Sequence, residues 1–152
     1  MNPPAVLLPR WLVKSEPDVF SWDDQVRAGI EPWTGVRNHA AKNHLKAMRR
    51  GDRAFFYHSN IGREIVGIVE VVREAYPDPT AEGGDWVAVD VKAVMPLPRP
   101  VPLAAIKAEP RLADLALVRQ ARLSVMPIAP HHAEILLRMG GLAPLAAGME
   151  GT

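Results

Sequence analysis

Proline and glycine constrain the fold of this chain more than any other feature of its sequence. Fifteen prolines and eleven glycines are spread over 152 residues. Proline cannot donate a backbone hydrogen bond, and both residue types interrupt helices and favour turns. Their density therefore favours short strands and frequent turns over a helical bundle.

Runs of aromatic and β-branched side chains predict one small mixed α/β (α+β) domain. Strands are expected near residues 11–13, 53–58, 65–72, 86–93 and 123–128. Helices are expected after Ser21, from Asn38 to about residue 50, and over residues 103–108 and 130–139. Gly67 lies within a β-branched run, which indicates a bulge or a close backbone contact. The pattern is typical of a curved antiparallel or mixed sheet, or a barrel, flanked by helices.

The domain is expected to occupy residues 10–142. Residues 1–9 are rich in proline and lack periodicity, which predicts a flexible leader, and a flexible tail is expected over residues 143–152. The prolines at 96, 98, 100 and 102 predict an extended connector. With no cysteine, disulfides and thiolate zinc sites are excluded. No apolar run is long enough for a membrane span, so we expect a soluble cytoplasmic protein with no membrane partner.

Positive charge is concentrated in one segment. The net charge of the chain is only +1, but residues 37–53 hold six basic side chains against Asp52 alone, a local charge of +5. Lys42, Lys46 and Arg49 recur at helical spacing, one position after an apolar stripe of Ala41, Leu45 and Met48. A local basic patch on a nearly neutral protein suggests an anionic partner, while a solvated helix face is the alternative.

The sequence contains no recognisable catalytic constellation. The Gly-x-Ser-x-Gly elbow, the phosphate-binding loop, the dinucleotide glycine fingerprint and the His-Glu-x-x-His pair are all missing. His131 and His132 are adjacent at the start of a helix and point in different directions, so we expect surface side chains and no shared metal. His58 and Ser59 are neighbours on a strand and face opposite sides, which argues against a base and nucleophile pair. We therefore predict a protein that is not an enzyme and needs no cofactor.

The four tryptophans have different expected roles. Trp11 and Trp86 begin strands and are expected in the core, and Trp22 is expected to pack beside the start of a helix. Trp33 precedes Thr34 and Gly35 in a turn, where a large aromatic side chain is suited to stacking on a ligand. The stretch 33–60 therefore predicts a pocket for a flat polar ligand such as a nucleobase.

Six sequence blocks in collinear order resemble those of an EVE domain, as in the thymocyte nuclear protein family. The resemblance covers about residues 10–142. The blocks are Trp11-Leu12-Val13-Lys14-Ser15-Glu16-Pro17, Trp33-Thr34-Gly35-Val36-Arg37-Asn38, Phe55-Phe56-Tyr57-His58-Ser59-Asn60, Glu74-Ala75-Tyr76-Pro77-Asp78, Val89-Asp90-Val91 and Arg122-Leu123-Ser124-Val125.

The resemblance implies a PUA-like fold, a curved β-barrel of about five to six strands related to YTH, ASCH and SRA domains. It further implies a reader of a modified base in nucleic acid, with modified cytosine in DNA favoured over RNA. The alternative is an RNA-binding or RNA-cleaving protein similar to ASCH domains. We expect the protein to be a monomer. The base pocket is then predicted to have Trp33 as its wall, together with Lys14, Ser15, Val36, Asn38, Tyr57, His58, Ser59 and Asn60. The nucleic-acid backbone is predicted to contact Arg37, Lys42, Lys46, Arg49 and Arg122.

Overall fold

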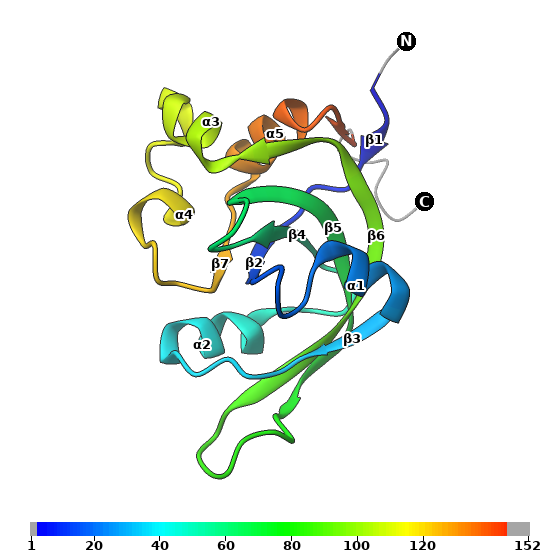
Figure 1. Ribbon diagram of the computed structural model, residues 1–152, viewed down its shortest axis with the longest axis vertical. Coiled ribbons are helices and arrows are strands. Elements are labelled where there is room, and N and C mark those ends of the chain that lie inside the picture. The colour runs from blue at the N-terminus through cyan, green and yellow to red at the C-terminus, as the bar shows by residue number, and fades with distance from the viewer. Residues whose placement is uncertain (1–2, 146–152) are drawn as a thin grey trace.

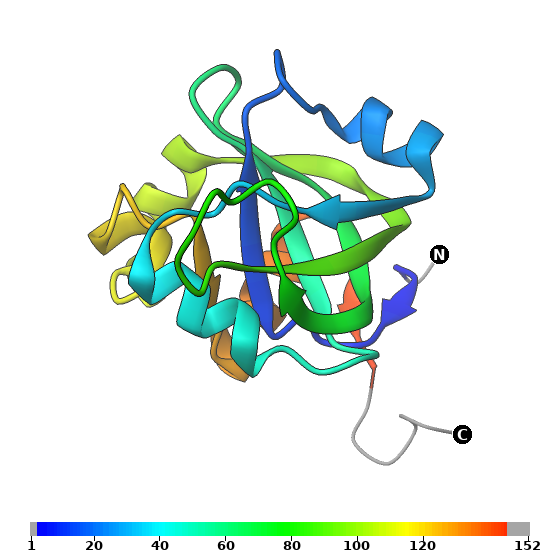
Figure 2. The same cartoon turned by 90° about the horizontal axis from the view of Figure 1, so that it is seen from below.

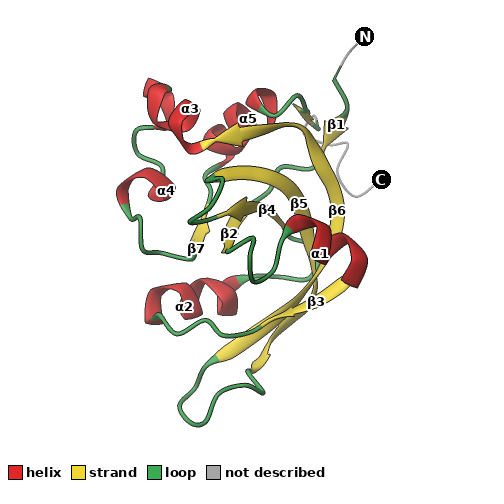
Figure 3. Cartoon of the chain, in the orientation of Figure 1, coloured by secondary structure: helices red, strands yellow, loops and turns green. Residues whose placement is uncertain are grey.

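A strongly curved sheet of six strands forms the centre of the computed structural model, which describes residues 3–145 (Figure 1). Short helices lie around this sheet, as the colouring by secondary structure shows (Figure 3). The strands are β2 (Trp11–Ser15), β3 (Ile30–Trp33), β4 (Arg53–His58), β5 (Glu64–Pro77), β6 (Val87–Pro102) and β7 (Val125–Pro127). The helices are α1 (Trp22–Ala28), α2 (His39–Ala47), α3 (Leu103–Ala108), α4 (Ala116–Arg119) and α5 (Pro130–Met139), with a 3-10 turn η1 at Pro110–Leu112.

The sheet has mixed pairing, one of the two arrangements that the sequence allowed. Its strand order is β3-β6-β5-β4-β2-β7, and only the β2–β4 pair is parallel. The described strands β3 and β7 lie at opposite ends of this order, so the sheet is curved without closing into a barrel. Antiparallel pairing of the long strands β5 and β6 builds the largest part of the curved surface. The predicted α+β class and strand number are confirmed.

The proline-rich segment expected to be a connector belongs instead to strand β6. Pro96 pairs with Gly67 and Pro102 pairs with Glu64, both on β5. Strand β3 covers only the part of β6 from Val89 to Lys92, so the proline-rich half is an edge strand on its other side. Proline has no backbone N–H to donate to a neighbouring strand. On an edge strand this costs no hydrogen bond at positions that face away from the sheet, because no strand lies there to accept one.

Helix α1 begins and ends where the local sequence predicts. Ser21 caps its N-terminus by accepting a hydrogen bond from the Asp24 backbone N–H, and the Asp24 carboxylate accepts in return from the Ser21 N–H. Gly29 ends the helix with a positive φ of 72°. Val26 is 53% exposed, because the buried face of this short helix carries Trp22 and Gln25.

Helix α2 also follows its predicted pattern. The Asn38 side chain caps it by accepting from the Ala41 backbone N–H at 2.9 Å. Ala41, Leu45 and Met48 are fully buried, which confirms the apolar stripe. The helix ends at Ala47, a few residues earlier than expected. Helices α3 and α5 occupy the predicted residues, whereas η1 and α4 were not predicted.

The two ends of the described chain are paired with each other. Strand β1 (Ala5–Val6) lies parallel to β8 (Ala143–Pro144), and Val6 is buried. These positions therefore differ from the loose leader and tail that the sequence predicted, because each end supplies the other with backbone partners. The remainder of the predicted tail, residues 146–152, lies outside the described residues. No helix among residues 3–145 is long and apolar enough to cross a membrane.

Gly67 allows the Trp22 ring to pack directly on strand β5. The register of β5 against β6 shifts between Ile65 and Gly67, which confirms the predicted irregularity. A Cβ atom at position 67 would lie 2.6 Å from two carbons of the Trp22 ring. The ring also packs edge-to-face against Phe56 with 5.3 Å between centroids, which confirms Trp22 as a packing residue.

Gly67→Ala is expected to destabilise the fold by about 1–3 kcal/mol, because the added methyl group overpacks the contact with Trp22. The free energy of unfolding in urea measures this effect. Combining Gly67→Ala with Trp22→Leu should cost less than the sum of the two single changes, since the smaller side chain makes room for the methyl group. Additive costs would contradict the proposed contact.

Candidate nucleic-acid interface

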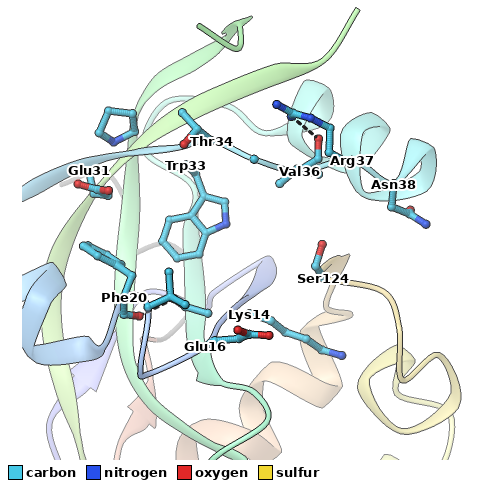
Figure 4. A pocket seen from close by; sticks show the side chains of 14 residues that line it. Lys14, Glu16, Phe20, Glu31, Trp33, Thr34, Val36, Arg37, Asn38 and Ser124 are labelled. Carbon is cyan, nitrogen blue, oxygen red and sulfur yellow. Dashed lines mark hydrogen bonds between the residues drawn. The ribbon is translucent and has the colours of Figure 1, made fainter. Parts of the chain in front are cut away.

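A cavity of about 530 Å³ lies between the end of β2 and the turn that joins β3 to α2. Five of the residues predicted for the base pocket line it: Lys14, Ser15, Trp33, Val36 and Asn38. Arg37, predicted as a backbone contact, lines it as well. Figure 4 shows the Trp33 indole pointing into the cavity, with Phe20 and Glu31 on one side and Lys14 and Ser124 on the other. This volume is typical of a ligand pocket.

Trp33 belongs both to the cavity wall and to the core. It is only 7% exposed and packs edge-to-face against Phe20 and Phe56, with centroid separations of 6.3 Å and 5.7 Å. The side chain is therefore needed by the core as well as by the cavity wall. The turn after Trp33 was recognised from the sequence, but the pairing of Trp33 with Val89 on β6, which carries it into the core, was not.

Asp78 holds the turn that forms one wall of the cavity. One of its carboxylate oxygens accepts hydrogen bonds from the Gly35 N–H at 2.8 Å and from Arg37 at 2.9 Å. Its other oxygen accepts from the N–H and hydroxyl of Thr80, both at 2.7 Å. Gly35 has a φ of 81°, which glycine adopts readily. Burial raises the pKa of Asp78, but the hydrogen bonds from Gly35, Thr80 and Arg37 outweigh burial and hold that pKa well below its ordinary value.

Trp86 lies over the start of α2. Its ring stacks on His39 with a centroid separation of 4.8 Å, and the charged groups of Arg37 and Lys42 lie 5.7 Å and 5.4 Å from its centroid. It is partly exposed, so the predicted core role of Trp86 is wrong, whereas that of Trp11 is confirmed. Together with Asp78, Trp86 anchors residues 35–42 to the loop between β5 and β6.

The basic stripe of α2 is partly neutralised by that same loop. The Lys42 ammonium lies 2.9 Å and 3.0 Å from the two carboxylate oxygens of Asp85, and the Lys42 side chain is only 8% exposed. Lys46 lies 3.6 Å from Asp85. The Arg49 side chain donates to backbone carbonyls at the end of α2. The row of cations expected from the sequence is therefore partly opposed, because Asp85, distant in sequence, lies beside α2 in the fold.

The polar residues at the end of β2 position the next loop. The Lys14 ammonium donates to the Ala121 carbonyl at 2.8 Å, and burial lowers the pKa of Lys14. The Ser15 hydroxyl donates to the Phe20 carbonyl, which fixes the loop that places Phe20 beside Trp33. The Asn38 side-chain oxygen is used as the cap of α2. These groups shape the cavity before any ligand binds.

Three other predicted pocket residues line a second cavity. Tyr57, Ser59 and Asn60 lie there with Lys14 and Glu16, at the far end of β4. His58 lines neither cavity, because its Nε2 accepts a hydrogen bond from the Trp22 N–H at 3.0 Å. Burial outweighs the nearby carboxylates and lowers the pKa of His58, in accord with this acceptor role. The single predicted pocket is thus two neighbouring cavities.

The EVE domain profile matches residues 9–139 of the chain. The chain belongs to the EVE domain family. Among its relatives, thymocyte nuclear protein 1 of Danio rerio is 35% identical over 170 aligned residues, which cover 90% of this chain and 74% of the relative. The predicted family is therefore confirmed.

Solved structures agree with this assignment. Rpa0253 from Rhodopseudomonas palustris is 63% identical, with a TM-score of 0.82 over 86% of this EVE domain chain and 92% of that protein. Human THYN1, in a crystal structure in complex with 5-methylcytosine-containing DNA, is 33% identical, with a TM-score of 0.80 over 88% of this chain and 98% of that one. A YTH domain from Zygosaccharomyces rouxii shares the fold, with a TM-score of 0.59 and 18% identity over 94% of this chain and 95% of that one.

Sequence reasoning missed several residues that line the main cavity of this EVE domain. They include Glu16, Phe20, Glu31 and Ser124. Ser124 lies within a block used for the resemblance, where only Arg122 was assigned a role, and this was a signal available in the sequence. Phe20 and Glu31 had no such signal, because their neighbours in the cavity come from other parts of the chain. Burial, and secondarily the nearby Asp90 carboxylate, raise the pKa of Glu31.

The adjacent histidines of the EVE domain do not form a metal site with a third residue. Among residues 3–145, no group of three or more His, Cys, Asp or Glu side chains is placed to hold a metal ion. The ring centroids of His131 and His132 lie 4.1 Å apart, and His132 is only 8% exposed. The expected surface position is therefore wrong for His132, which faces the core side of α5.

Proposed function

We propose that this EVE domain is a non-catalytic binding domain that takes a modified base, a modified cytosine in DNA, into the cavity beside Trp33. The observation that carries the proposal is this aromatic-walled cavity in a chain whose relative human THYN1 is known in complex with 5-methylcytosine-containing DNA. Of the predicted backbone contacts, Arg49 and Arg122 are exposed but do not line this cavity.

Stacking supplies one part of the binding energy. A base stacked on an aromatic side chain gains about 1–3 kcal/mol, and extruding a base from a duplex costs a few kcal/mol. Trp33, with Phe20 beside it, provides the aromatic surface. Stacking alone therefore does not offset extrusion, and contacts to the base edge and to phosphates must contribute.

The chemistry of the cavity fits cytosine better than thymine. Cytosine presents an exocyclic N4 amine, for which a carboxylate is a good acceptor, whereas thymine presents a carbonyl oxygen there. The carboxylates of Glu16 and Glu31 both line the cavity. A 5-methyl group would be accommodated by the apolar part of the lining, which includes Val19, Phe20 and Trp33. Burial of one methyl group contributes about 0.8 kcal/mol, or about fourfold in affinity.

Four otherwise identical single-stranded oligonucleotides test both features of the base. They carry cytosine, 5-methylcytosine, uracil or thymine at one position, so that the methyl group and the group at position 4 vary independently. We expect the methyl group to raise affinity about fourfold, both from cytosine to 5-methylcytosine and from uracil to thymine. We expect the two bases with an amine at position 4 to bind about tenfold or more tightly than the two with a carbonyl there. Fluorescence anisotropy measures the four dissociation constants. Equal affinities for all four oligonucleotides would refute the proposed function.

The non-catalytic part of the proposal has its own control. The same oligonucleotides, and an RNA of the same sequence, are incubated with the protein with and without Mg²⁺ and then separated by size. All should be recovered intact. Turnover of any of them would assign the cavity to a nuclease.

A further inference from the structure

The second cavity, of about 480 Å³, lies on the other side of Lys14 from the Trp33 cavity. It is formed by the ends of β2 and β4, the β4–β5 hairpin, and helices α3 and α4. The hairpin lies beside the start of α3 (Figure 2), where the Leu103 N–H donates to the Arg63 carbonyl at 2.8 Å. Lys14 and Glu16 line both cavities, so the two are contiguous.

Cations dominate the lining of this second cavity. Lys14, Arg63 and Lys107 face a single carboxylate, that of Glu16. Within the described residues, none of these three cations forms a salt bridge. This distinguishes them from Lys42 and Lys46, which are paired with Asp85. This cavity therefore offers a polyanion three cations that no ion pair engages.

Hydroxyl groups add further hydrogen-bond donors to the cations that line this cavity. Tyr57 lines the cavity although the residue as a whole is only 3% exposed, and it contributes one hydroxyl group. Ser59 beside it contributes a second hydroxyl. Arg63 adopts a left-handed backbone conformation with a φ of 45°, an uncommon one for arginine, within the tight hairpin that directs it here. Hydroxyl and guanidinium donors together suit the oxygens of a phosphate group.

We propose that this cavity binds a backbone phosphate of the strand whose base occupies the Trp33 cavity. This inference rests on the proposed function and deepens it. Because both cavities share Lys14, the strand runs from Trp33 past Lys14 toward Arg63 and Lys107. The phosphate path thus follows the ends of β2 and β4 and the hairpin, and does not follow the predicted basic stripe of α2.

The double variant Arg63→Gln/Lys107→Gln tests the proposal. We expect its affinity for an unmodified single-stranded oligonucleotide, and for the same strand with one 5-methylcytosine, to fall about tenfold in each case, because phosphate contacts carry no base information. The logarithmic salt dependence of binding should become shallower by about 0.7 for each cation removed. The ratio of the two affinities should remain unchanged.

A matched control removes the same charge elsewhere. The control is Arg50→Gln/Arg138→Gln, in which both arginines are exposed and lie outside the two cavities. Arg50 lies just before the start of β4, and Arg138 is in the last turn of α5. This variant should bind both oligonucleotides within about twofold of the unaltered protein. Melting temperatures of both double variants verify that they fold. Equal losses in the two variants, or no loss in Arg63→Gln/Lys107→Gln, would overturn the phosphate site.

Two further outcomes separate the possible failures. If the unaltered protein does not distinguish 5-methylcytosine from cytosine while Arg63→Gln/Lys107→Gln still weakens binding, the proposed function fails and the phosphate site stands. Inorganic phosphate tests the source of the anion. It should displace the oligonucleotide no better than chloride at equal ionic strength, and displacement at micromolar phosphate would overturn the assignment to a nucleic-acid strand.

Discussion

Trp33→Ala is expected to lower the free energy of unfolding by about 3–5 kcal/mol, the usual cost of removing a buried tryptophan. The side chain is 7% exposed and packs edge-to-face on Phe20 and Phe56, so its removal leaves a void in the core. Binding of the folded fraction should fall as well, by about 1–3 kcal/mol, because the stacking surface is lost. Urea unfolding and oligonucleotide affinity, measured on the same preparation, record the two effects separately.

A milder pair of variants isolates the contribution of Trp33 to binding. Trp33→Phe and Trp22→Phe both shrink a buried tryptophan that packs against Phe56, but only Trp33 lines the main cavity. Each should destabilise the fold. Only Trp33→Phe should weaken the affinity for the oligonucleotide with 5-methylcytosine. It should also reduce the ratio of that affinity to the affinity for the same oligonucleotide with cytosine. If the two variants bind equally well, the Trp33 cavity is not the base site.

Asp78→Ala is expected to destabilise the fold by about 2–4 kcal/mol. The Asp78 side chain is fully buried and accepts hydrogen bonds from Gly35, Arg37 and Thr80. Its removal leaves the Gly35 and Thr80 N–H groups without their acceptor, while Arg37, with 38% of its side chain exposed, regains water. The turn that walls the Trp33 cavity should loosen, so binding should weaken too. Asp114→Ala, which breaks an exposed pair with Arg119, should cost less than about 1 kcal/mol.

The same carboxylate predicts a component of acid sensitivity. The pKa of Asp78 is lower in the folded protein than in the unfolded chain, so its ionised form stabilises the fold. This contribution is complete above the unfolded-state pKa of about 3.9 and is lost as the pH falls from there toward the folded-state pKa. Asp78→Asn should therefore lose less stability than the unaltered protein when urea unfolding is repeated at falling pH. Parallel pH profiles of the two proteins would contradict this role.

The sequence by itself determined the elements that depend on neighbours along the chain. Ser21 with Asp24 marks the start of α1, Asn38 marks the start of α2, and Gly29 ends α1. Gly67 revealed a close contact within a strand, although its partner Trp22 was not foreseen. Caps, turns and strand alternation are set by side chains within a few residues, and a sequence pattern records them directly.

Tertiary structure alone decided the properties of the binding surface. The row of lysines on α2 reads as uncompensated charge until the loop after β5 brings Asp85, 43 residues away from Lys42, to within hydrogen-bonding distance. Trp33 reads as a turn residue until β3 pairs with β6 and carries it into the core. Tyr57 follows Phe56 in β4 and Ser59 lies just past the end of that strand, yet both line a different cavity from Trp33. Charge neutralisation, burial and the division of a surface into cavities are set by groups that meet only when distant segments pack, which is why local sequence patterns did not predict them.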